Sequence, residues 1–221
     1  MSNLTEIIDK VKVQVERIYE ENWGKYPTSH DMLHILRVCN LAMIIALNEN
    51  IGERELHLLK LACLLHDIAL PMKGCKQDHA SESAKIAKKL LENYKLNSNE
   101  IELICNAIRE HSWTSKKRPS TIISAILQDA DRLDALGVVG FARMICYGEY
   151  MKRKLHHPLE VMPKKRRVDD EAYTLDHVFA KLVKLPKSMN TKTGRKIANK
   201  RLKKLLSLIE DFESEITSCS T

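Results

Sequence analysis

Apolar residues recur every three or four positions along most of the chain, which is the spacing of one face of an α-helix. The first stripe predicts a helix over about residues 4–21. A second helix should reach about Asn48, with Thr28 or Ser29 as its N-cap. A third, over about 53–68, contains LHLLKLACLLHD and is apolar almost all round. This pattern is typical of a buried helix at the centre of a domain.

Similar stripes continue to the end of the chain. A loop with Pro71 and Gly74 should lead to a fourth helix whose N-cap is Asp78. Further helices are predicted at about 98–112, 119–136, 138–148, 171–185 and 192–216. The helix over 119–136 should stop at Gly137.

Composition supports the same class of fold. Only seven glycines and six prolines interrupt the 221 residues, and the stretches between them are rich in good helix formers. The chain is long enough for one well-buried core. We therefore expect an all-α helical bundle, one domain over residues 1–221, with a core over about 28–147 and C-terminal helices over about 171–216.

The charge pattern changes this picture in one segment. Residues of about 148–170 contain YMKRKLHHPLEVMPKKRRVDD, which is basic, includes two prolines and has weak periodicity. We expect an exposed flap there, in which Lys164, Lys165, Arg166 and Arg167 contribute to substrate binding more than to chemistry. PKKRRV also resembles a nuclear-import signal, but a loop facing phosphate or solvent is the favoured interpretation. The net charge of +7 suits polyanionic partners, including nucleotides.

The absence of a signal peptide, a membrane span and paired cysteines would indicate the cellular compartment. The N-terminal segment has no apolar stretch of the kind that a signal peptide needs, and no segment is expected to reach the roughly 20 apolar residues of a membrane span. The six cysteines form no CxxC pair. Reduced thiols in a cytoplasmic protein are therefore expected, with no membrane partner.

Several histidines lie where apolar residues would be expected. His34, His66 and His111 are on or beside apolar stripes, and Asp67 ends the most hydrophobic helix. One such histidine is usually a core residue, but buried imidazoles and carboxylates together must be paired or coordinated. A divalent cation would satisfy all of them. Ligands without thiolates fit Mn, Mg, Fe, Co or Zn, with open positions for water and phosphate.

Periodicity does not decide which aspartate of the helix over 119–136 joins this cluster. Asp131 continues the stripe of Ile123 and Leu127, whereas Asp129 continues the stripe of Ile122 and Ile126. The pattern alone therefore leaves either aspartate as a possible member of the cluster.

At this point the sequence resembles a known family. His34 with HILRV after it, LLHDIA at 64–69 and QDADRLDALG at 128–137 look like the H, HD and D elements of HD-superfamily phosphohydrolases. DHASESA, IREHSW and FAKLVKLPKSMNTKTGRKIANKR extend the resemblance over nearly the whole chain. They are similar to segments of the small bacterial and archaeal HD-domain nucleoside triphosphate pyrophosphohydrolases.

The resemblance implies roles for individual residues. It implies metal ligands at His34, His66, Asp67 and Asp131, and supporting roles beside the ligands for Asp129 and Asp134. His79 and His111 correspond either to ligands of a second ion or to groups that contact phosphate. Candidates for substrate binding are Arg37, three positions after His34, and Lys181 and Arg195 in the C-terminal segment.

We therefore expect a metal-dependent phosphohydrolase that uses one or two divalent ions and cleaves nucleoside or deoxynucleoside triphosphates to monophosphate and pyrophosphate. A di-iron oxygenase of the HD type, or another HD nucleotidase or phosphodiesterase, is the alternative. The partner should be a nucleotide and not nucleic acid, since a regulator that binds RNA would not need the four ligands. A homodimer is left open.

Overall fold

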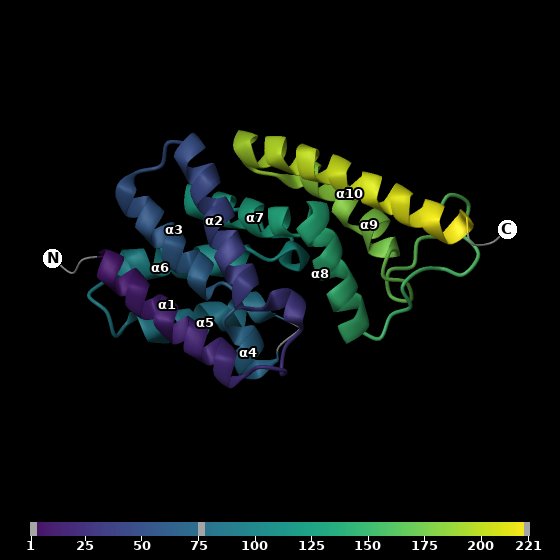
Figure 1. Ribbon diagram of the computed structural model, residues 1–221. Coiled ribbons are helices and arrows are strands. Elements are labelled where there is room, and N and C mark those ends of the chain that lie inside the picture. Colours follow the sequence, from purple (N-terminus) through teal and green to yellow (C-terminus); the bar gives the residue numbers. More distant parts are fainter. Residues whose placement is uncertain (1–3, 75–77, 219–221) are drawn as a thin grey trace. The chain divides into compact units, whose positions relative to one another are not determined.

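The computed structural model describes residues 4–74 and 78–218, in which every named element is a helix (Figure 1). The all-α prediction is confirmed. The chain forms two compact units, Met1–Tyr26 with His30–Asp131, and Pro27–Ser29 with Arg132–Thr221. The single domain expected from the sequence stays a prediction.

The first unit is built around one helix, α3. Its helices are α1 (Leu4–Glu21), α2 (Met32–Asn48), α3 (Glu53–Leu65), α4 (Ala69–Lys73), α5 (His79–Leu91), α6 (Ser98–Glu110) and most of α7 (Ile122–Asp134). Helix α3 packs against α1, α2, α5 and α6 (Figure 1). Leu59, Leu61 and Leu65 on it are completely buried. The prediction of a central helix is confirmed, because a helix that is apolar all round needs neighbours on every side.

Two helix ends differ from the predictions. Helix α2 begins at Met32, because Thr28–His30 form a 3₁₀ turn and the Asp31 carboxylate accepts a hydrogen bond of 2.9 Å from the His34 backbone N–H. Asp31 is thus the N-cap, and neither Thr28 nor Ser29 is. Helix α3 ends at Leu65, three residues before the predicted end.

The segment expected as a loop after α3 is partly helical. Helix α4 includes Pro71 in its first turn, where the missing N–H of proline does no harm. Gly74, with a φ of 59°, ends it. Asp78 precedes α5 as predicted, but its φ is 58° and its side chain makes no capping hydrogen bond.

One segment is apolar and long enough to cross a membrane by length and composition. It is Thr28–Asn48, with a mean hydropathy of 1.4. One such helix is weak evidence for a membrane span, so the expectation of no membrane segment stays a prediction. The core helix of a soluble protein passes the same test. His34, Val38 and Ile45 on α2 are fully buried, as their shared stripe predicted.

The second unit contains α8 (Gly137–Tyr150), α9 (Asp176–Ala180), a 3₁₀ helix over Leu182–Ser188 and α10 (Lys192–Ser218). Helix α10 packs against α8 and the 3₁₀ helix (Figure 1). The helix predicted from residue 171 starts only at Asp176. The preceding residues form turns with one isolated β-bridge between Lys154 and Tyr173, in which the Lys154 N–H donates to the Ala172 carbonyl at 3.0 Å and the Thr174 N–H donates to the Lys154 carbonyl at 2.8 Å.

Four of the six cysteines belong to the described part of the chain. Cys39, Cys63, Cys105 and Cys146 are free thiols, in line with the expectation for them. Cys75 and Cys219 lie outside the described residues.

Candidate metal centre

The first unit gathers four imidazoles around one carboxylate, that of Asp67. Its Oδ2 atom lies 3.7 Å from Nε2 of His34 and 3.6 Å from Nε2 of His66. Its Oδ1 atom lies 3.6 Å from Nε2 of His79 and 3.3 Å from Nε2 of His111. Each carboxylate oxygen therefore faces its own pair of histidines.

These side chains come from four helices and the turn after α3. His34 lies in the first turn of α2, which Asp31 caps. His66 is the C-cap of α3, and Asp67 follows it directly. His79 begins α5, and His111 is the C-cap of α6. Helix ends can direct side chains inward without interrupting the apolar stripes behind them, so the cluster is compatible with a well-packed core.

Backbone carbonyls fix the orientation of two imidazoles. The Nδ1 atom of His66 lies 2.8 Å from the Cys63 carbonyl oxygen, and that of His111 lies 2.7 Å from the Ile108 carbonyl oxygen. Since a carbonyl oxygen can only accept, Nδ1 carries the proton in each ring. The Nε2 lone pairs then point toward Asp67, which is the arrangement that orients histidine ligands of metals.

The burial of the cluster calls for a further partner. His34 and His66 have no exposed surface, and His111 and Asp67 are 2% and 3% exposed. Neither Nε2 of His66 nor Oδ1 of Asp67 has a hydrogen-bond partner among residues 4–74 and 78–218. Leaving such atoms unsatisfied costs about 1–3 kcal/mol each. A divalent cation would remove this cost, and nitrogen with oxygen donors suits a first-row metal or magnesium.

Two groups of donors fit this requirement. One is His34, His66 and Asp67, and the other is Asp67, His79 and His111; within each, the ligand atoms lie within 4.8 Å of one another. Asp67 belongs to both. Its carboxylate therefore lies between two possible cation positions. The sequence analysis expected one or two ions, and the number depends on whether the second group, Asp67, His79 and His111, binds one.

The electrostatics of the cluster differ from residue to residue. Burial lowers the pKa of His66 to about 4 and also lowers that of His79. Burial acts in the same direction on His111, but the carboxylates of Asp67 and Asp131 outweigh it and raise its pKa. Burial opposes ionisation of Asp67, yet the imidazoles of His66, His111 and His34 hold its pKa well below the usual range. The carboxylate is therefore charged at neutral pH.

These directions predict an order of protonation in protein freed of metal by a chelator. In a histidine NMR titration, His111 should titrate above its ordinary pKa, His79 below it and His66 near pH 4. A lowered pKa means that the stability from neutral His66 is present above the unfolded pKa of about 6.5 and is lost as pH falls toward 4. For His111 the sign is opposite, so its contribution is lost as pH rises. His66→Gln and His111→Gln would assign the signals; the reverse order would contradict the arrangement around Asp67.

The two aspartates of α7 differ in their contacts with the cluster and in their burial. Asp131 Oδ1 lies 3.5 Å from Nε2 of His34, and the Asp131 side chain is 24% exposed. Asp129 is completely buried. Asp131 thus contacts one member of the cluster from a position that water can reach. Its pKa is lowered, because the imidazoles of His34, His111 and His66 outweigh the effect of burial.

The other predicted residues lie in different surroundings. Arg37 is half-buried on α2, within the first unit. Asp134, Lys181 and Arg195 belong to the second unit. Asp134 forms an ion pair of 3.1 Å with Arg143, whose Nε donates to the Ser29 carbonyl at 2.7 Å. The Arg195 guanidinium donates to the Met189 carbonyl at 3.0 Å. Their predicted roles stay predictions.

Sequence reasoning missed two contacts of the cluster. The His30 ring lies 5.5 Å from the His34 ring, edge to face. The Tyr19 hydroxyl donates to the Asp67 carbonyl at 3.3 Å and so supports the turn from α1. His30 stands four residues before His34, a signal available in TSHDMLH. The sequence contains no such signal for Tyr19, because its position fits the apolar stripe of α1.

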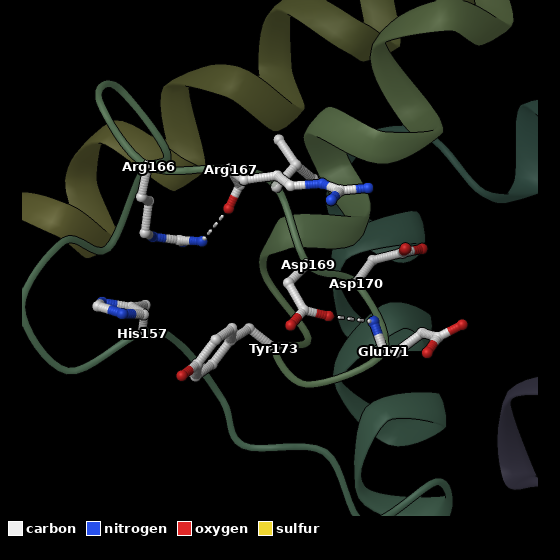
Figure 2. A pocket seen from close by; sticks show the side chains of 8 residues that line it. His157, Arg166, Arg167, Asp169, Asp170, Glu171 and Tyr173 are labelled. Atoms are coloured by element: carbon white, nitrogen blue, oxygen red, sulfur yellow. Dashed lines mark hydrogen bonds between the residues drawn. The ribbon is translucent and has the colours of Figure 1, made fainter.

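The basic flap differs from its prediction at one residue. Figure 2 shows Arg166 beside Tyr173, with the Arg167 side chain directed away from it. Lys164, Lys165 and Arg167 are exposed as expected, but the Arg166 side chain is only 14% exposed. It donates two hydrogen bonds of 2.6 Å to the Asp176 carboxylate. Arg166 was therefore wrongly predicted to face solvent.

The cluster lies within a segment of the chain that is similar to a known family. Residues 32–136 match the family model described as the HD domain. The chain contains an HD domain. His66 and Asp67 are an adjacent histidine–aspartate pair within the matched residues, and HD domains bind divalent metals.

Relatives of the HD domain extend the similarity beyond it. YpgQ of Bacillus subtilis is 28% identical over 196 residues, which cover 86% of this chain and 85% of YpgQ. The structure of an HD-superfamily hydrolase from Bacillus thuringiensis has a TM-score of 0.73 and 28% identity, covering 97% of this chain and 99% of that one. The structure of YpgQ in complex with ADP has a TM-score of 0.70 and 27% identity, covering 96% of both chains. The chain is thus similar to HD-superfamily hydrolases over nearly its full length.

Proposed function

We propose that this HD protein is a metal-dependent phosphohydrolase that cleaves nucleoside or deoxynucleoside triphosphates to the monophosphate and pyrophosphate. The observation that carries the proposal is the Asp67 carboxylate, each of whose oxygens faces a pair of buried histidines. Such a cluster would supply only part of the ligands that a divalent cation needs. Water and a phosphate oxygen would complete the coordination.

Three further observations support a nucleotide as the substrate. The complex of YpgQ with ADP shows that a relative of similar length and fold binds a nucleotide. The motifs DHASESA, IREHSW and QDADRLDALG resemble those of HD-domain nucleoside triphosphate pyrophosphohydrolases. The net charge of +7 is in keeping with an anionic substrate.

The chain's own residues would divide the chemistry as follows. His34, His66, Asp67 and Asp131 would hold one cation, and Asp67, His79 and His111 would hold a second. A bound cation would supply Lewis acidity at a phosphoryl oxygen and lower the pKa of a water molecule toward neutrality. Asp131 is charged and its side chain is partly exposed, so as a ligand it would lie on the side of the site that water can reach.

A panel of nucleotides with several metals tests this proposal. Each nucleoside and deoxynucleoside triphosphate would be incubated with Mn, Mg, Co, Zn or Fe, and phosphate and pyrophosphate would be measured separately. We expect monophosphate and pyrophosphate in equal amounts. Release of inorganic phosphate alone would point to a different bond, and no hydrolysis of any nucleotide with any metal would refute the proposal.

The same geometry supports a second candidate, an oxygenase with two iron ions. A carboxylate between two histidine pairs could equally hold iron at both positions. Iron content and oxygen consumption distinguish the two candidates, since the hydrolase needs no oxygen. Consumption of oxygen that depends on both His79 and His111 would favour the oxygenase.

A further inference from the structure

A tight turn follows directly after His111 in the first unit. Trp113–Ser115 form a 3₁₀ helix, and Lys116 then has a φ of 52°. A left-handed conformation is uncommon for lysine and persists only where the surroundings impose it. The Ser115 hydroxyl donates to the Ser112 carbonyl at 2.7 Å and closes the turn from within.

One buried side chain holds the two ends of this turn together. The Gln128 amide nitrogen donates to the Glu110 carbonyl at 2.7 Å and to the Lys117 carbonyl at 3.1 Å. Gln128 is 1% exposed. Gln128 thus holds the backbone of Lys117 close to that of Glu110, the residue before His111. The Glu110 carboxylate also accepts from the Ser120 backbone N–H at 2.9 Å, which fixes the departing chain.

The turn contains one partly exposed tryptophan and three exposed basic residues. Trp113 is half-buried and lies two residues from His111, so their Cα atoms are at most about 7 Å apart. Lys116, Lys117 and Arg118 are exposed. Their side chains form no ion pair with any residue in the part of the chain that the structure describes. An indole beside adjacent cations is the combination that binds a nucleobase by stacking and its phosphates by charge.

We infer that the turn Ser112–Arg118 is the nucleotide-binding element of this site. The indole of Trp113 is the surface on which the nucleobase stacks, and Lys116, Lys117 and Arg118 attract the polyphosphate toward the cluster. The inference rests on the proposed function and adds to it the residues that recognise the substrate. It also assigns to the segment between α6 and α7 a role in substrate binding that the sequence analysis placed on the flap and on Arg37, Lys181 and Arg195. Stacking accepts every base, so the element favours nucleotides as a class over one particular base.

The tryptophan content of the chain allows a direct test. The chain has two tryptophans, Trp23 and Trp113. Trp23 is 66% exposed and lies far from the turn in the sequence. In a Trp23→Phe background, emission reports Trp113 alone. The probes are the α,β-methylene analogue of ATP, in which the bond proposed for cleavage is blocked, and inorganic tripolyphosphate. We expect the analogue to quench the emission and tripolyphosphate to bind without quenching.

Substitutions separate the two parts of the element by calorimetry. Trp113→Ala should weaken binding of the analogue about tenfold and leave tripolyphosphate unaffected, and Trp113→Phe should restore most of the affinity. Neutralising Lys116, Lys117 and Arg118 to Gln should weaken both ligands, more at low salt than at high salt. The matched control replaces Lys10, Lys12 and Arg17 on α1, exposed cations that pair with Glu6, Glu16 and Glu21. It should change neither affinity.

The outcomes distinguish this inference from the proposed function. If calorimetry shows the analogue bound while Trp113 emission and the affinity of Trp113→Ala and Trp113→Phe are unchanged, the turn is not the binding element, and the proposed function stands. If the triple Gln variant behaves as the control does, the basic residues have no part in it. A wild-type protein that neither binds the analogue nor hydrolyses any triphosphate overturns both.

Discussion

Asp67→Ala is expected to remove divalent metal from both positions and to abolish hydrolysis. Each oxygen of Asp67 faces a different histidine pair, at 3.3–3.7 Å, so both donor groups lose their shared carboxylate in one substitution. Substitutions that only disturb the orientation of a metal ligand already cost about 10–100-fold in affinity or activity. Loss of a ligand that serves both positions should cost more. Metal analysis of the purified variant and initial rates of hydrolysis would measure the two effects.

The variant should keep its helices, because Asp67 lies in the turn after α3 and does not belong to the apolar packing of that helix. Circular dichroism would show this. Asp9→Ala, an exposed aspartate on α1, is the matched control and should change neither metal content nor rate. His79→Ala removes a donor from the second group only. It should therefore leave one ion where the wild type holds two. Full metal content and normal activity in Asp67→Ala would show that the site is assigned to the wrong residues.

Arg166→Ala should destabilise the second unit strongly, although PKKRRV reads as a solvent-exposed basic run. The Asp176 carboxylate has no exposed surface, and it accepts two hydrogen bonds of 2.6 Å from Arg166 and one of 2.7 Å from the Asp169 backbone N–H. Removing one partner of a buried pair leaves an uncompensated charge, at a cost of about 3–5 kcal/mol. For a chain of this size the melting temperature should fall by roughly 6–20 °C. Thermal unfolding followed by circular dichroism would measure it.

Arg167→Ala is the matched control, because it removes the same kind of side chain from the next, exposed position. It should change the melting temperature little. Adding Asp176→Asn to Arg166→Ala should recover part of the loss, since the buried charge then disappears. Equal melting temperatures for Arg166→Ala and Arg167→Ala would contradict the account. The flap can be tested for substrate binding only with Arg166 intact. Neutralising Lys164, Lys165 and Arg167 should then raise KM with kcat nearly unchanged, if they contact the substrate.

The sequence by itself determined most of the helices and the burial of three histidines. Periodic apolar residues report which face of a helix is buried, so His34 and His111 could be placed on inward faces and α3 at the centre. The ends of the helices were less well determined. Asp31, and not Ser29, caps α2, because Ser29 lies in the 3₁₀ turn that precedes the helix. Which of several neighbouring polar residues becomes the N-cap depends on the conformation of the preceding segment.

Only the tertiary structure decided which side chains meet. Periodicity left Asp129 and Asp131 equivalent, since both continue apolar stripes, and the contact of Asp131 with His34 depends on how α7 packs. The same is true of His79, which reaches Asp67 from the first residue of another helix. Arg166 lies in irregular chain, where no periodic signal exists, and its partner Asp176 is ten residues away at the start of α9. Local pattern is set by neighbours in sequence, whereas a cluster or an ion pair is set by packing between segments that the pattern does not connect.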